Sequence, residues 1–204
     1  MEGSDAETLN IWMDNPTIIM KSVKVAVVAV LAALSVGSNY AMMYVYNVKF
    51  MDLIVFVGGF CFGPLFGGLI GVLSWSVYGV LNPFGFSLPI WVATMFSETI
   101  YGVIGGLMRK SLVGKFAGAR CGQFGIHVFF GTLGVFLTLF YDVVTNVVFM
   151  YTVHQPALIS VIMGVPFALV HVLSNGLFFG VGCVPAIRAV MKAVGGGAFV
   201  FPKK

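Results

Sequence analysis

Four apolar stretches, each long enough to cross a lipid bilayer, constrain the fold most strongly. A hydrocarbon core about 30 Å thick is crossed by about 20 apolar residues in a helix. Residues 23–43, 88–108, 122–152 and 158–187 reach this length, and tilt accommodates the longer ones. Because 59% of the residues are hydrophobic and only 9% are charged, the sequence predicts an all-α integral membrane protein. We expect it to lie in a lipid bilayer and not to bind nucleic acid.

The stretch 50–81, FMDLIVFVGGFCFGPLFGGLIGVLSWSVYGVL, is too long for one span and short for two. Pro64, preceded by Gly63 and followed by two further glycines, is the expected break. Cytoplasmic loops collect Lys and Arg. A helical hairpin here, with the N-terminus inside, places ten of the 11 Lys and Arg inside and only Lys49 outside, whereas a single span places two inside and nine outside. The sequence therefore predicts six transmembrane helices with both termini in the cytoplasm.

This topology divides the chain into a polar cytoplasmic tail at 1–15, a six-helix transmembrane domain at 16–192 and a second tail at 193–204. The start, MEGSDAETLNIWMDN, is acidic and polar, so we expect no cleaved signal peptide and a multi-pass protein of the cell membrane. The three cysteines lie far apart without CxxC spacing, which indicates neither a disulfide frame nor a metal site.

Three carboxylates lie outside the acidic tail: Asp52 near a helix start, Glu98 in the fourth predicted helix and Asp142 in the fifth. A charge at mid-membrane costs about 2.5–3.5 kcal/mol on insertion scales, so such residues face a partner or a cavity. At 1.5 Å per residue, Asp142 and Glu98 lie about 15 Å, and His171 about 20 Å, from the outer ends of their helices. These three side chains are therefore expected at one depth.

On each predicted helix the polar residues also share one face. The polar stripes are Thr94, Glu98, Tyr101 and Gly105; Thr138, Asp142, Thr145, Asn146 and Phe149; and Phe167, His171, Ser174, Asn175 and Phe178. The sequence predicts a polar pocket near the outer face. The alternative is that these groups only hydrogen-bond one another between helices. The aromatic residues Tyr40, Trp75, Tyr78, Trp91 and Tyr151 fit either a pocket or an interfacial belt.

Recognisable catalytic motifs are missing from the sequence. It has no phosphate-binding G-x-x-x-x-G-K-[ST] loop, and neither HExxH nor GxSxG, so the chain is not expected to be an enzyme or to hydrolyse ATP by that route. An intramembrane enzyme would have to rely on Glu98, Asp142 and His171. Small residues recur every four positions at Gly59, Gly63, Gly67 and Gly71 and at Ala29 and Ala33, a spacing that favours close helix packing.

Residues 20–190 resemble the substrate-binding S component of an energy-coupling factor (ECF) vitamin transporter. The matching features are Ala29-VLA-Ala33, DLIVFVGGFCFGPLFGGLIGVLS with its Gly63-Pro64 break, FYDVVTNVVF (140–149) and GVPFALVHVLSNGLFF (164–179). The resemblance implies a six-helix protein that captures a vitamin-like small molecule from outside. A separate transmembrane coupling protein with two ATPase subunits would supply the energy, and no cofactor is implied.

The resemblance also implies roles for particular residues. Ala29 and Ala33 would dock the coupling protein, and the loops 39–49 and 82–87 would act as lids. The combined prediction for the substrate-binding residues is Asn39, Tyr40, Asn82, Trp91, Glu98, Tyr101, Asp142, Asn146, His171 and Asn175.

The substrate itself does not follow from the sequence. Thiamine, riboflavin, a pyridine vitamin, a cobalamin fragment and a queuosine precursor all remain open. Two ionised carboxylates facing an imidazole would suit a cationic or donor-rich group. Two other functions also remain open: a proton-coupled carrier in which Glu98 and Asp142 titrate, and a scaffold that binds no small molecule.

Overall fold

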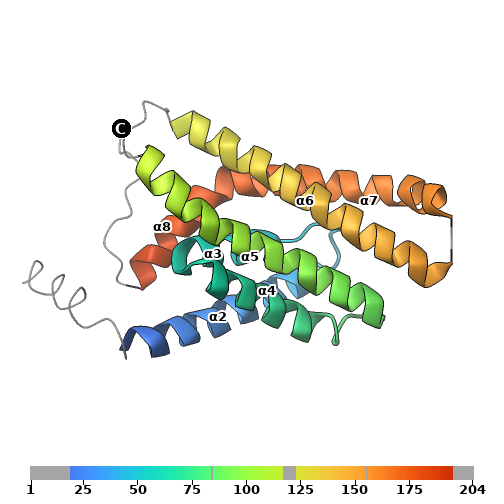
Figure 1. The fold of residues 1–204 in the computed structure, drawn as a ribbon, viewed down its shortest axis with the longest axis horizontal. Helices are drawn as coiled ribbons and strands as arrows, with labels where there is room; N and C mark the ends of the chain where they lie inside the picture. Colours follow the sequence, from blue (N-terminus) through green and yellow to red (C-terminus); the bar gives the residue numbers. More distant parts are fainter. Residues whose placement is uncertain (1–18, 84, 117–122, 155, 195–204) are drawn as a thin grey trace, which may run out of the picture.

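The computed structural model describes residues 19–83, 85–116, 123–154 and 156–194, and these ranges form helices without strands (Figure 1). The all-α prediction is confirmed for them. The helices are α2 (Ile19–Ala41), α3 (Met51–Phe62), α4 (Pro64–Tyr78), α5 (Leu88–Phe116), α6 (Gln123–Val153), α7 (Ala157–Leu177), the π-helix η1 (Phe178–Gly182) and α8 (Cys183–Ala193). The last three follow one another without interruption and correspond to the sixth predicted helix. Residues 1–15, and all but two residues of 193–204, lie outside the described ranges.

Three segments of the described chain are long and apolar enough to span a bilayer, namely Leu88–Arg109, Phe124–Val153 and Ile162–Ala193. The segments Val25–Ala41, Met51–Phe62 and Pro64–Tyr78 are apolar but shorter. At 1.5 Å per residue, a helix of the length of α3 rises only about 18 Å. Because α3 and α4 are shorter than a full bilayer span, the six membrane spans and their orientation stay predictions.

The chain reverses between α3 and α4 at Gly63, where the sequence predicts a break. Gly63 has a φ of 101°, a left-handed conformation that glycine adopts without a Cβ penalty, and Pro64 begins α4. Lys49, which precedes α3, lies 5.7 Å from the ring of Trp75 in the last turn of α4. Because the start of α3 and the end of α4 meet in this way, the two helices form a hairpin.

Glycines bring the hairpin into backbone contact with α5. Gly59 of α3 and Gly67 of α4 both face Gly102 of α5, and a Cβ on any of the three would overlap backbone atoms of another. Small residues allow such close approach where no hydrophobic force drives helices together. The predicted packing role of these glycines agrees with this crossing, which fixes α3 and α4 beneath α5 (Figure 1).

The π-helix η1 keeps one face of the last helix turned inward. Five fully buried residues recur at every fourth position: His171, Asn175, Phe179, Cys183 and Ile187. An α-helix has 3.6 residues per turn, so this spacing would drift around its surface, and the wider turns of a π-helix oppose that drift. His127 on α6 contacts the carbonyl oxygen of Gly180 in η1, with Nδ1 at 2.5 Å. This alignment brings His171 and Asn175 to the bundle interior.

Candidate functional site

His171 lies between two carboxylates from different helices. Its Nδ1 is 2.9 Å from Asp142 Oδ1 on α6, and its Nε2 is 2.8 Å from Asp52 Oδ2 on α3. Asp52 and His171 are fully buried and Asp142 is 7% exposed. Each of the two contacts needs one proton, so the three groups share two protons and carry one net negative charge wherever the protons reside. This cluster, called here the Asp–His–Asp cluster, joins α3, α6 and α7.

A hydrogen-bond network extends the cluster toward α5. Asn175 Nδ2 donates to Asp52 Oδ2 (2.5 Å) and to Thr138 Oγ1 (2.8 Å), and the Tyr101 hydroxyl donates to the same Thr138 oxygen at 2.9 Å. Thr138 in turn donates to the Gly134 carbonyl at 2.8 Å. A hydroxyl has two acceptor positions and one donor, so the hydrogen-bonding capacity of Thr138 is fully used. These residues fix the position of Asp52 rather than face open space.

Glu98 is fully buried at the side of this network. Its Oε2 accepts a hydrogen bond from Trp75 Nε1 at 3.3 Å, whereas the His171 ring is occupied by the two aspartates. Glu98 therefore orients the indole of Trp75. Trp75 in turn lines two cavities.

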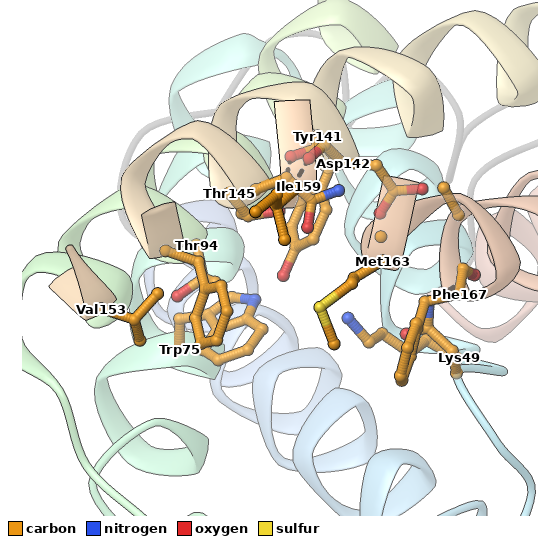
Figure 2. A pocket seen from close by; sticks show the side chains of 15 residues that line it. Lys49, Trp75, Thr94, Tyr141, Asp142, Thr145, Val153, Ile159, Met163 and Phe167 are labelled. Carbon is orange, nitrogen blue, oxygen red and sulfur yellow. Dashed lines mark hydrogen bonds between the residues drawn. The ribbon is translucent and has the colours of Figure 1, made fainter. Parts of the chain in front are cut away.

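A cavity of about 430 Å³ lies against the Asp–His–Asp cluster. Figure 2 shows the Lys49 amine and the Tyr141 hydroxyl pointing into it, with Trp75 on one side and Met163 and Phe167 on the other. Its remaining lining includes Asn47, Thr94, Asp142, Thr145, Asn146, Phe149, Val153, Ile159, Gly164 and Ala168. Ligand sites in proteins are of this size and combine apolar walls with a few polar groups. We call this space the main cavity.

A second cavity of about 450 Å³ lies on the other side of the chain segment that precedes α3. It shares Asn47, Lys49, Trp75 and Phe167 with the main cavity. Its other lining residues include Asn39, Met42, Met43, Tyr44, Tyr78 and Asn82. Lys49 and Asn47 thus stand between the two cavities.

The segment 42–50 is fastened across the bundle to α7. Asn47 has a φ of 49° and donates from Nδ2 to the Phe167 carbonyl oxygen at 2.7 Å. The Tyr46 and Phe167 rings lie 4.6 Å apart, and the Phe50 and Phe178 rings stack at 4.2 Å. This segment, called here the strap, connects the end of α2 to α7 and holds Lys49 at the main cavity.

The structure distributes the ten predicted substrate-binding residues over four places. Asp142 and Asn146 line the main cavity, and Asn39 and Asn82 line the second. Behind the main cavity lie the buried residues Glu98, Tyr101, His171 and Asn175. The remaining two make hydrogen bonds away from the cavities: Tyr40 to the Leu81 carbonyl and Trp91 to the Trp75 carbonyl, both at 2.8 Å.

Sequence reasoning did not assign Asp52 or Lys49 to the site. The sequence predicts Asp52 near a helix start, whereas α3 begins among buried residues and puts this carboxylate beside His171. The available signal was the length of 50–81, because a hairpin too short for two full spans must begin below the surface. The sequence likewise places Lys49 in a loop.

Comparison with protein families gives a match over most of the chain. The sequence model of the family described as "ECF transporter, substrate-specific component" matches residues 23–181, which is more than half of the chain. Comparisons with curated proteins and with solved structures gave no match.

Proposed function

The chain belongs to the family of ECF transporter substrate-specific components, and from this premise we propose that it captures a vitamin or related micronutrient on the outer side of a cell membrane. Members of this family are membrane-bound transporter subunits that bind substrate and associate with ECF transmembrane and ATPase components. The proposal also includes ATP-driven uptake, six membrane spans and both termini on the cytoplasmic side. The substrate class likewise belongs to the proposal.

One observation supports capture over interhelical bonding alone: polar groups beside the main cavity lack protein partners. The Tyr141 hydroxyl and Asp142 Oδ2 are buried without a hydrogen bond in the described part of the chain. Buried polar groups are normally satisfied, and leaving one unpaired costs about 1–3 kcal/mol. Both residues line the cavity. A bound molecule would complete the hydrogen bonds of both groups at the cavity wall.

The experiment that tests this proposal is mass spectrometry of small molecules retained by the purified protein. We expect one organic compound in stoichiometric amount. A proton-coupled carrier would transport that compound along a proton gradient without any ATPase subunit, and an enzyme would convert it in detergent as a single chain. Either result, or protein that retains and binds nothing, would contradict the proposal.

We also propose that Ala29 and Ala33 form the docking surface for the transmembrane component. Both are exposed on α2, whose opposite face buries Leu31 and Ala32. Within the described ranges, α2 packs mainly on α3 and α4 at one edge of the bundle, so its small-residue face is open (Figure 1). Two helices can approach closely over such residues.

Replacing Ala33 by tryptophan tests this docking surface. The bulky side chain should leave substrate binding within about two-fold of wild type but reduce ATP-driven uptake at least ten-fold, because the helices of the partner could no longer approach α2. The matched control is Val143→Trp, which changes a 61% exposed position on α6. Uptake that is equally impaired in both variants, or normal in Ala33→Trp, would refute the docking role.

A further inference from the structure

The charge that faces the main cavity without a counter-ion is positive. Lys49 makes no ion pair with any residue that the structure describes, since both ion pairs found there belong to His171. Its ammonium group lies 4.8 Å from the centre of the Tyr141 ring and 5.7 Å from that of Trp75. Aromatic faces attract a cation but do not neutralise it. An unpaired ammonium in a partly enclosed site therefore has unused capacity for an anion.

Each carboxylate of the Asp–His–Asp cluster has one oxygen engaged internally. Asp142 directs Oδ1 to His171, and Asp52 is bonded by both His171 and Asn175. Two shared protons hold the Asp–His–Asp cluster together, and no ion pair joins it to Lys49 in the described ranges. A cationic ligand entering the main cavity would meet the ammonium of Lys49, so the geometry argues against the cationic group that the sequence alone suggested.

A second donor converges with Lys49 on the same space. The Tyr141 hydroxyl is buried, has no partner in the described ranges and points into the main cavity with the Lys49 amine (Figure 2). An ammonium and a phenol hydroxyl together can donate to the two oxygens of a carboxylate. The walls beyond them, formed by Trp75, Phe149 and Phe167, are flat aromatic surfaces.

From these contacts we propose that the substrate carries an anionic group, bound by Lys49 and Tyr141, on an aromatic or otherwise apolar body held between Trp75 and Phe167. This inference rests on the proposed capture function and specifies its substrate class. Lys49 acts as the residue that selects for charge, and the strap over α7 sets its position through Asn47.

The test uses two sets of ring compounds that differ only in charge. One set is nicotinate, nicotinamide and 3-(aminomethyl)pyridine, and the other is indole-3-acetate, indole-3-acetamide and tryptamine. Binding of each compound to the purified full-length protein would be measured by calorimetry. In at least one set, we expect the anion to bind at least ten-fold tighter than the amide and the amine. A hydrogen bond to a charged group strengthens binding by about ten-fold or more. Lys49→Gln should reduce this preference below three-fold, and Lys49→Arg should retain it.

Other outcomes separate the inference from the function on which it rests. Tighter binding of the amines, equal binding within both sets, or an anion preference that survives Lys49→Gln would overturn the inference. A co-purified metabolite without an acidic group would also overturn it while leaving the capture function intact. If no compound binds and no metabolite co-purifies, the capture function fails, and the inference fails with it.

Discussion

Replacing His171 by alanine should lower the free energy of unfolding by about 3–5 kcal/mol, because Asp52 and Asp142 would be left buried without the imidazole between them. Reversible unfolding in mixed detergent micelles would measure the change. Capture of the substrate should be lost as well, since Asp142 would no longer be held at the cavity wall.

The double variant His171→Ala with Asp52→Asn provides the control. Removing one of the two buried charges should recover part of the lost stability, so the two substitutions should be strongly non-additive. An unfolding free energy of His171→Ala within about 0.5 kcal/mol of wild type, the range of ordinary surface substitutions, would show that the cluster does not hold these helices together.

Gly67→Ala is the second substitution with a large expected effect. A Cβ at this position would overlap the Gly102 carbonyl and the Gly59 Cα, and backbone atoms cannot move aside without separating the helices. Overpacking of this kind costs about 1–3 kcal/mol and occasionally more, and we expect the upper end or loss of folded protein. Yield and thermal stability in detergent would report the effect.

The neighbouring residue Gly68 offers a matched control on the same helix. A Cβ there would meet only methyl groups of Thr99 and Val103 at 3.4 Å, which is an ordinary contact. Gly68→Ala should therefore leave stability unchanged or raise it by up to about 1 kcal/mol, because alanine is the better helix former. Equal behaviour of the two variants would contradict the role assigned to the glycine crossing.

The sequence predicts the helices and part of the site because each of these features is encoded within a short stretch of the chain. Apolar run lengths locate α5, α6 and the long last helix, and the Gly63-Pro64 pair locates the hairpin turn. The periodicity of α6 and α7 places Asp142 and His171 on facing stripes, and the structure brings them within hydrogen-bond distance.

The rest of the site depends on where α3 begins within the bundle. Counting residues along the chain does not give that position. The strap lets α3 begin beside His171, so Asp52 enters the site from a predicted helix start and Lys49 from a predicted loop. Trp91 shows the opposite error. It lies near the site in sequence, but its indole is bonded to the Trp75 backbone and its ring packs near Phe86.

The most direct test of the central claim is the amount of small molecule retained by a variant whose main cavity is filled. Gly164 lines this cavity, and the three atoms nearest to a Cβ built there belong to the Asn146 side chain, at 2.9–3.1 Å, so a leucine would displace that side chain and fill the cavity. Val165→Leu, at the adjacent 46% exposed position, is the control. Wild type and Val165→Leu should retain equal amounts of one compound by quantitative mass spectrometry, and Gly164→Leu less than one-tenth as much. Equal retention by all three proteins would show that capture occurs elsewhere in the molecule.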